Sequence, residues 1–331
     1  MIETLYIEEQ AQRHPRTQAI VGKFPQAKIV ECRHYGEIFN RAGQNFRLQK
    51  SRPALILALK GQRRVLPVPA GFELGSGPAH YFSHMLNCLY DCRYCFLQGM
   101  FRSAHYVLFV NYEDFMLDIL ELARDTTSPQ WFFSGYDCDS LALDPVTEFA
   151  EHAITALEPA ENVWLELRTK STQIRSLLRR PAMPRVVCAF SLNPEPIIKL
   201  YEHDTPTLAR RIAALRRLAA HGWQIALRFD PLFLTRTFKA DYQRLFEQIR
   251  AGLGLHLQQI HSITLGCYRL PTSYAQRMER LFPDEKLFAQ SLPEHDGLVG
   301  YPAGVSAEML EWSEQSLRRL GFTAPVYIQS A

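Results

Sequence analysis

The sequence lacks any long apolar run. None of its 331 residues belongs to a stretch of about 18 apolar residues, the length that crosses a bilayer. The first residues, MIETLYIEEQAQRHP, have neither the basic flank nor the apolar centre of a signal peptide. We therefore expect no membrane segment and a cytoplasmic location.

Cysteine and net charge are also scarce. Seven cysteines are too few for a disulfide scaffold in a chain of this length, and the number is odd. A formal charge of +3 makes only a weak case for a polyanionic partner. No solenoid repeat or low-complexity tract is visible. Three of the cysteines, however, lie within eight residues, and such bunching points to a metal site.

The pattern of apolar residues predicts an α/β fold. Short runs rich in β-forming residues alternate with stretches of helical period, as in a parallel sheet wrapped by helices. The simplest architecture is a partial (β/α)6 barrel of the TIM type, with an N-terminal extension at 1–80, the barrel at 81–270 and a C-terminal extension at 271–331. Strands are predicted at 131–134, 163–168, 186–192, 224–230, 262–266 and just before Cys88, with one more at 54–60 in the extension. Helices are predicted at 145–157, 171–179, 205–222, 240–252 and 307–320.

The clearest helix is predicted at 205–222. Thr205 can cap its start with Pro206 at the first position, and Gly222 can end it. Its arginines lie off the apolar stripe, which favours a solvated face over a nucleic-acid footprint. These arginines are Arg210, Arg211, Arg216 and Arg217.

The three bunched cysteines are Cys88, Cys92 and Cys95. Three thiols on one tight loop can bind a cubane iron–sulfur cluster and leave one iron free. Structural zinc is the alternative, but it needs four ligands, and no second Cys or His pair has a suitable spacing. The spacing C-x3-C-x2-C, with Tyr94 before the last cysteine, resembles the signature of the radical S-adenosylmethionine superfamily. That resemblance implies a 4Fe-4S cluster whose free iron binds S-adenosylmethionine, with Tyr94 near the adenine.

Further segments resemble one branch of that superfamily, the spore photoproduct lyases and spore photoproduct lyase-like proteins. The similarity runs from about residue 80 to about 300, and each matched segment follows a predicted strand. In such a barrel the active site gathers at these strand ends. The segments are CRYCFLQGMF at 92–101, SGYDCDSLALD at 134–144, ELRTKS at 166–171, FSLNPE at 190–195, RFDPLF at 228–233, LGCYRLP at 265–271 and LFPDEKL at 281–287.

The family pattern implies a set of contacts to S-adenosylmethionine. Lys170 and Ser191 match the family's lysine and serine that touch this cofactor, and Asp139 and Ser140 lie nearby. Taken from the residues alone, Lys170 would be a surface lysine and Ser191 a turn residue. Glu166 and Arg168 alternate with leucines on their strand, so they face the other side of it as a structural or a catalytic pair.

The residue that returns a hydrogen atom departs from the family pattern. The family uses a cysteine in the second segment, helped by a tyrosine directly after the last cluster cysteine, and here that position is Phe96. Cys138 lies in the right segment but two residues from the donor position, which Tyr136 occupies. The hydrogen donor can therefore be Cys138 or Tyr136, and packing near the cluster is the alternative role for Cys138.

Outside these segments, Cys32 and Cys188 are expected to be structural, whereas Cys267 ends the last predicted strand and can meet substrate. A few other side chains are candidates for phosphate or base contacts. They are Tyr268, Arg269, Arg102 and His105.

The resemblance implies a radical S-adenosylmethionine lyase that repairs a thymine photoproduct in DNA, with a reductase such as flavodoxin or ferredoxin as electron donor. A basic groove is then expected at the barrel mouth, because a lesion inside a duplex must be exposed first. One alternative keeps the radical chemistry on a small molecule, a protein or an RNA. Another is a non-catalytic, cluster-containing protein that binds nucleic acid.

Overall fold

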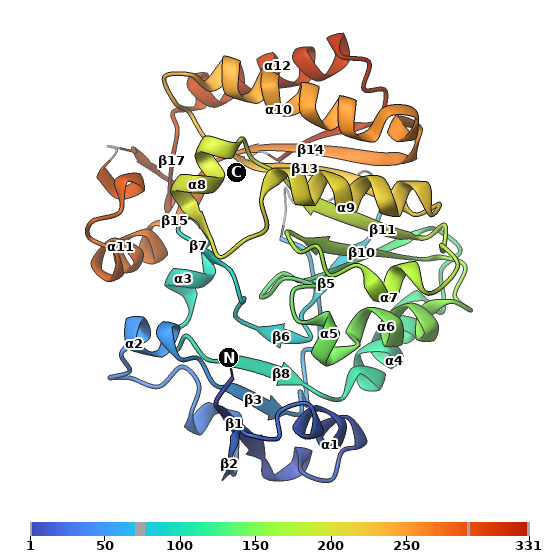
Figure 1. Cartoon of the computed structure of the whole chain (residues 1–331), viewed down its shortest axis with the longest axis vertical. Helices are drawn as coiled ribbons and strands as arrows, with labels where there is room; N and C mark the ends of the chain where they lie inside the picture. The colour runs from blue at the N-terminus through green and yellow to red at the C-terminus, as the bar shows by residue number, and fades with distance from the viewer. Residues whose placement is uncertain (1, 70–76, 290–291, 330–331) are drawn as a thin grey trace.

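The computed structural model describes residues 2–69, 77–289 and 292–329. A curled parallel sheet forms the centre of the molecule, with helices along its outer side (Figure 1). Among the described residues, no helix is long and apolar enough to span a membrane.

The large sheet has the strand order β18-β14-β13-β11-β10-β9-β5-β4. Every neighbouring pair from β18 to β5 is parallel, and only β4 runs antiparallel. The predicted partial barrel is confirmed, with β9, β10, β11, β13 and β14 at the predicted positions. The sixth predicted strand is β5, which ends at Phe82, whereas β6 (Met85–Leu86) directly before Cys88 belongs to the second sheet. The strands are β4 (Val65–Pro67), β5 (Ala79–Phe82), β9 (Gln130–Ser134), β10 (Val163–Thr169), β11 (Val186–Ser191), β13 (Gln224–Leu232), β14 (Ile260–Cys267) and β18 (Val326–Gln329).

Helices cover the convex face of this sheet because alternate side chains of each strand are apolar. Leu165 and Leu167 of β10 belong to the main core, which they share with the covering helices. The other face carries a separate small cluster that includes Val187 and Ala226, and by alternation Glu166 lies on that concave side. The covering helices are α4 (Tyr112–Ala123), α6 (Phe149–Leu157), α7 (Arg175–Leu178), α9 (Leu208–Ala220), α10 (Phe238–Leu253) and α12 (Ala303–Arg319).

Two predicted helices differ from the structure. The segment 145–157 forms two helices, α5 (Asp144–Thr147) and α6, because Glu148 between them has a left-handed backbone with φ of 53°. The segment 171–179 forms only the short α7. A left-handed residue interrupts the run of backbone hydrogen bonds, and apolar periodicity does not reveal it.

Helix α9 begins later than the sequence indicates. Its N-cap is Thr207, whose side chain accepts a hydrogen bond from the backbone of Arg210, whereas the predicted cap Thr205 bonds to the carbonyl of Glu202. The expectation that all four arginines are solvated is wrong for Arg211, which is fully buried.

A second sheet packs beside the barrel, in the order β2-β1-β3-β8-β6. Strands β6 and β8 come from the two sides of the cysteine loop, so this loop leaves and re-enters the N-terminal sheet. The boundaries predicted at 80 and 270 stay predictions. The elements are β1 (Thr4–Glu8), α1 (Pro15–Gly22), β2 (Lys28–Cys32), α2 (Phe46–Ser51), β3 (Leu55–Ala58), β6 (Met85–Leu86) and β8 (Tyr106–Phe109).

The C-terminal part contains a small antiparallel sheet and then returns to the barrel. β15 (Arg269–Pro271), β17 (Leu298–Gly300) and β16 (Glu294–His295) form this sheet, and α11 (Thr272–Leu281) follows β15. Helix α12 then leads to β18, which pairs with β14. Strand β18 is therefore the last strand of the half-barrel sheet along the chain.

We predict that Thr207→Ala lowers the free energy of unfolding by about 1 kcal/mol, the usual effect of removing a side-chain cap. Urea unfolding followed by circular dichroism measures the change. Arg216→Ala, an exposed substitution in the same helix, is the control and should change stability by less than about 0.5 kcal/mol. Equal effects of the two substitutions would contradict the assigned cap.

Candidate active site

The cysteine loop lies near the carboxyl ends of the barrel strands, beside α3 (Leu97–Met100) (Figure 1). Within the loop, β7 (Asp91–Cys92) pairs antiparallel with β12 (Glu202–His203), which places Cys92 opposite Glu202. The backbone N–H of Cys95 donates to the carbonyl of Cys92 at 3.0 Å. Cys92 is buried, and Cys88 and Cys95 are partly buried. The backbone thus brings the three predicted ligands together in one protected loop.

The donor set suits an iron–sulfur cluster better than a single metal ion. Within the described ranges, no three Cys, His, Asp or Glu side chains are arranged to hold one ion. A cubane attaches its thiolates to separate irons, so its ligands need not converge on one point, whereas zinc needs four that do. Burial and then the nearby Asp139 raise the pKa of Cys88 to about 12. Burial raises the pKa of Cys188 and Cys138 in the same way, so the fit to a cluster rests on three thiols in one protected loop.

Tyr94 is tied to a buried carboxylate rather than lying free at the surface. Its hydroxyl donates to Glu202 Oε1 at 2.5 Å, and the amide of Asn193 donates to the same oxygen at 3.0 Å. The ring of Tyr94 packs on Phe233, with 5.0 Å between centroids. These bonds hold the cysteine loop against the ends of β11 and β13.

Arg211 balances the charge of Glu202. Its Nη2 lies 2.5 Å from Glu202 Oε2, and both side chains are fully buried. Another guanidinium nitrogen, Nη1, donates to the backbone carbonyl of Ser191 at 3.1 Å. Burial acts to raise the pKa of Glu202, but Arg211 and then Lys170 outweigh it and hold that pKa below its usual value.

Asp139 joins the ends of β9 and β10. Its Oδ1 accepts from the hydroxyl of Thr169 at 2.6 Å and from the backbone N–H groups of Leu141 and Ala142. Its Oδ2 accepts from the backbone N–H of Lys170 at 2.7 Å. The carboxylate therefore sets the direction in which the chain leaves β10 toward the cysteine loop.

Lys170 and Ser191 lie at the same end of the sheet. Lys170 Nζ is 5.5 Å from the centroid of the Tyr94 ring. Burial acts to lower the pKa of Lys170, but Cys92 and then Glu202 outweigh it and raise that pKa, so the ammonium stays charged. Ser191 ends β11 and is buried. Ser140, from the adjoining loop, bonds through its hydroxyl to Ser134 at 2.6 Å.

A buried ion pair stands on the concave face of the sheet. Glu166 of β10 contacts Arg228 of β13 at 2.6 Å and Arg168 at 3.0 Å, and Ser262 lies 3.1 Å from Arg228. Glu166 and Arg168 therefore pair as their alternation with leucines predicts. Burial acts to raise the pKa of Glu166, but Arg228 and then Arg168 outweigh it and lower that pKa.

The two candidate hydrogen donors lie in different surroundings. Tyr136 is 38 % exposed, and its ring centroid lies 5.4 Å from Phe96 and 4.3 Å from Tyr81. Cys138 is part of the main core, with its sulfur 4.0 Å from His84 Nδ1. Burial raises the pKa of both Tyr136 and Cys138, so each keeps its hydrogen at neutral pH.

Most of the other sequence candidates take part in packing. Tyr268 is buried and stacks on Phe233, and the Nδ1 atom of His105 accepts a hydrogen bond from the backbone of Ala54. Arg269 donates a hydrogen bond to Asp230 at 3.1 Å, and the thiol of Cys267 donates to the backbone carbonyl of Ser306. Arg102 is exposed. The remaining cysteines, Cys32 and Cys188, are buried.

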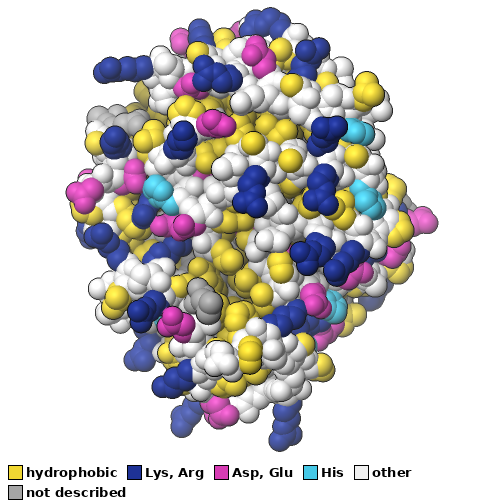
Figure 2. Space-filling view, in the orientation of Figure 1, with side chains coloured by type: hydrophobic (Ala, Val, Ile, Leu, Met, Phe, Trp, Pro, Cys, Tyr) yellow, Lys and Arg dark blue, Asp and Glu magenta, His cyan; other side chains and the backbone are white. Residues whose placement is uncertain are grey.

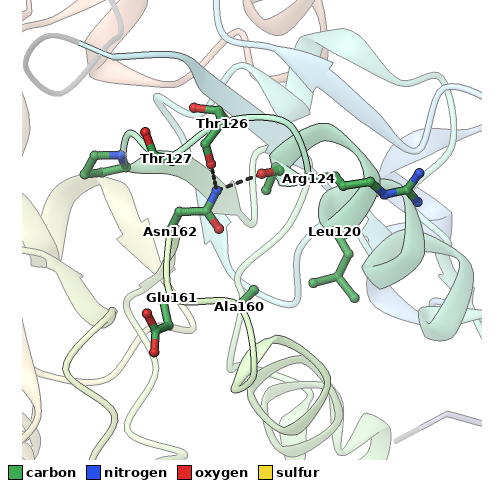
Figure 3. Close-up of a pocket in the computed structure, with 9 residues that line it drawn as sticks. Leu120, Arg124, Thr126, Thr127, Ala160, Glu161 and Asn162 are labelled. Carbon is green, nitrogen blue, oxygen red and sulfur yellow. Dashed lines mark hydrogen bonds between the residues drawn. The ribbon is translucent and has the colours of Figure 1, made fainter.

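A surface cavity of about 480 Å³ lies at the opposite end of the sheet (Figure 3). It opens beside the starts of β9 and β10, where the Asn162 amide donates to the carbonyls of Ala123 and Thr126 at 2.7 and 2.6 Å. It contains no cysteine and none of the predicted site residues. In parallel barrels the chemistry occurs at the other ends of the strands, so this cavity is not the site.

The sequence does not predict the hydrogen-bond network around Glu202. Glu202 and Tyr242 belong to no recognised motif, and Arg211 is predicted to lie on the surface. The one local indication is that Arg211 is a charged residue within a run of apolar residues. Tyr242 donates through its hydroxyl to Asn193 at 3.1 Å, which adds α10 to the network.

Comparison with known proteins gives a consistent result. The family described as "Spore photoproduct lyase" matches residues 1–294. The chain is 25% identical to spore photoproduct lyase of Bacillus subtilis (strain 168) over 86% of this chain and 83% of that one. It is 24% identical to the enzyme of Geobacillus sp. (strain Y412MC61), again over 86% and 83%.

Solved structures show the same fold. One is a spore photoproduct lyase double mutant with bound S-adenosylmethionine and a dinucleoside spore photoproduct. It superposes with a TM-score of 0.87 at 19% identity, over 100% of this chain and 99% of that one. A tyrosine-to-phenylalanine mutant of spore photoproduct lyase gives the same TM-score, identity and coverage. Both superpositions therefore include the N-terminal sheet and α12 as well as the half-barrel.

We predict that Glu166→Gln destabilises the protein by about 3–5 kcal/mol at pH 7, because it leaves Arg228 buried without a counter-charge. The pKa of Glu166 is lowered in the folded state, so its contribution is complete above the unfolded pKa and is lost as the pH falls through the folded pKa. The difference from wild type should therefore shrink in acid. Urea unfolding from pH 7 downward measures it.

Glu158→Gln is the matched control for that experiment. Its carboxylate meets Arg180 at 3.2 Å but is 63% exposed, and exposed pairs contribute less than about 1 kcal/mol. If both variants unfold alike, the buried pair does not have the assigned role.

Proposed function

The chain belongs to the spore photoproduct lyase family, and we propose that it repairs a methylene-bridged thymine photoproduct in DNA by S-adenosylmethionine-dependent radical chemistry. The observation that carries the proposal is the loop of three cysteines at the carboxyl ends of a parallel half-barrel, beside a charged lysine. The family match runs to residue 294 and includes every strand of this half-barrel except β18.

Cys88, Cys92 and Cys95 would hold a 4Fe-4S cluster with one iron open to S-adenosylmethionine. When bound and reduced, this pair supplies a 5′-deoxyadenosyl radical. The protein itself has to aim this radical and keep water away from it. The buried network around Glu202 keeps the cysteine loop close against the barrel, which serves both needs.

Five residues would form the site for S-adenosylmethionine. Lys170 offers a fixed positive charge for its carboxylate, and Ser191 and Ser140 offer hydroxyl groups. Asp139 would position Lys170, since its carboxylate already accepts hydrogen bonds from the hydroxyl of Thr169 and the backbone N–H of Lys170. Tyr94 would lie under the adenine with its hydroxyl held by Glu202.

Tyr136 is the better placed of the two hydrogen donors. It occupies the family's donor position, is partly exposed and contacts Phe96, which directly follows the last cluster cysteine. Cys138 faces His84 within the core. After the methylene bridge breaks, Tyr136 would give its O–H hydrogen to the thymine radical, and the resulting tyrosyl radical would lie against Tyr81.

Phe96 also favours a second candidate, in which the same radical acts on a different substrate. A phenylalanine has no O–H, so the family's tyrosine relay is absent at this position. Substrate tests therefore have to include a chemically defined lesion.

The remaining expectations are a cytoplasmic location and a flavodoxin or ferredoxin as electron donor. None of the seven cysteines forms a disulfide, in keeping with a reducing compartment.

The cysteine loop also contains Arg93, whose guanidinium contacts Asp91 at 3.1 Å. An electron donor would approach the cluster from outside the loop.

The decisive experiment is anaerobic reconstitution with iron and sulfide, followed by reduction in the presence of S-adenosylmethionine and a synthetic dinucleoside photoproduct. We expect two thymidines and cleavage of S-adenosylmethionine, both measured by mass spectrometry. Cleavage without any thymidine would favour the second candidate. No cleavage by the fully loaded protein would reject the radical chemistry itself.

We predict that Lys170→Ala weakens the binding of S-adenosylmethionine and leaves the cluster in place, because the lysine is a charge partner and not a ligand. Cofactor titration of the reconstituted protein measures the affinity, and visible absorbance measures the cluster. Cys92→Ala is the contrasting variant and should lose both the brown absorbance and 5′-deoxyadenosine formation. Normal affinity in Lys170→Ala would remove this residue from the site.

We predict that Tyr136→Phe loses most thymidine formation while S-adenosylmethionine is still cleaved, because only the O–H of this residue is removed. Repair by wild type in D2O should place one deuterium in the product methyl group, since the phenol proton exchanges with solvent. Cys138→Ala should keep both results. The reverse pattern would assign the donor to Cys138.

A further inference from the structure

Three arginines from two distant segments of the chain lie near α3, the short helix that follows the cysteine loop. Arg277 of α11 donates through Nη1 to the carbonyl of Gly99 in α3 at 3.3 Å. Arg102 follows two residues after the end of α3, and Arg280 lies one turn along α11 from Arg277. Burial, then Arg102 and then Arg280 lower the pKa of Arg277. The positive charges of Arg102 and Arg280 therefore act on Arg277.

A close backbone contact fixes this arrangement. A Cβ atom at Gly99 would lie 2.7 Å from both the Cβ and the carbonyl oxygen of Tyr274. Helices α3 and α11 thus meet at a distance that only glycine allows at this position. This packing fixes the backbone that carries Arg277 and Arg280 relative to α3.

In the parts of the chain that the structure describes, none of the three arginines forms an ion pair, whereas buried or half-buried arginines such as Arg64 and Arg180 do. Capping α3 uses only one N–H group of Arg277, and a guanidinium has five. Like charges held close together raise the free energy of the folded state, and a bound anion relieves this cost.

The arginines continue a surface that begins with aromatic rings. Tyr274 lies one turn before Arg277 on α11, and both Tyr274 and Phe96 pack on the same cluster of buried side chains. Phe96 in turn contacts Tyr136. Figure 2 shows Lys and Arg side chains over much of this face, including the left margin, over the region that α11 and α2 occupy in Figure 1. Rings that can stack on bases thus adjoin charges that can bind phosphates.

We propose that Arg102, Arg277 and Arg280 form a phosphodiester-binding site that holds the DNA strand beside the lesion. The inference rests on the proposed function, because it assumes a substrate with a nucleic-acid backbone. Guanidinium groups bind phosphate oxygens through paired N–H donors and keep their charge at any physiological pH. Phosphate contacts position a strand without reading its sequence, which suits an enzyme that must accept any flanking bases.

The test compares Arg102→Gln/Arg280→Gln with wild type. Both residues are exposed, and Arg277 stays in place to cap α3. Fluorescence anisotropy with a labelled single-stranded oligodeoxythymidine, repeated between 50 and 200 mM NaCl, is the measurement. Binding should weaken by on the order of tenfold at low salt, and the slope of log affinity against log salt should become shallower by about 0.7 for each lost phosphate contact.

Arg216→Gln/Arg217→Gln is the matched control, because it removes the same charge from the exposed side of α9. It should leave affinity and salt slope close to those of wild type. Circular dichroism and the urea midpoint show whether the variants are folded. If both double variants lose the same DNA affinity, the loss comes from net charge alone, and the proposed site is wrong.

Further outcomes separate this site from the proposed function. Unchanged DNA binding in the Arg102/Arg280 variant would overturn the site even if wild type repairs the dinucleoside, which carries no phosphate. Tighter binding of the matching RNA, dependent on the same two arginines, would overturn the DNA assignment. Failure of wild type to repair the dinucleoside would reject the proposed function, and the anisotropy results would still decide the phosphate site.

Discussion

The buried carboxylate of Glu202 is the contact on which the candidate site depends. It accepts the Tyr94 hydroxyl from the cysteine loop and the Asn193 amide from the end of β11, and it pairs with Arg211 of α9. A buried charge must be paired and fully hydrogen-bonded to be tolerated, so these elements are held in one arrangement. Apolar side chains of the loop, among them Tyr94 and Phe96, add packing contacts to these polar ones.

The half-barrel has an apolar side and a polar side because its strands alternate. Leu165 and Leu167 face the helices, and Glu166 faces inward to Arg228. The ion pair keeps polar groups on the concave surface without leaving a charge unpaired. A radical enzyme needs such a surface to be dry near the reacting carbon yet able to orient a polar substrate.

The rings around Phe96 show how the family's chemistry can be arranged differently in this chain. The rings of Tyr136 and Tyr81 lie close to Phe96, where the family has a tyrosine. Under the proposed assignment of Tyr136, the O–H group that serves the reaction would come from the loop after β9 and not from the cysteine loop. Beyond these rings, the short distance between Gly99 and Tyr274 brings α11 to the same edge and with it the arginines.

The sequence by itself predicted the half-barrel and the family, which are both confirmed, and the three cysteine ligands, which stay a prediction. Short apolar runs rich in β-forming residues indicate the strands, and the spacing of three cysteines indicates a cluster loop, because both are local patterns. Tertiary structure alone decided that β8 joins β3, that Thr207 caps α9 and that Arg211 is buried against Glu202. The pairing of β8 with β3 and of Arg211 with Glu202 joins segments whose closeness no local pattern records. Burial of an arginine also depends on a partner that becomes visible only when the chain is folded.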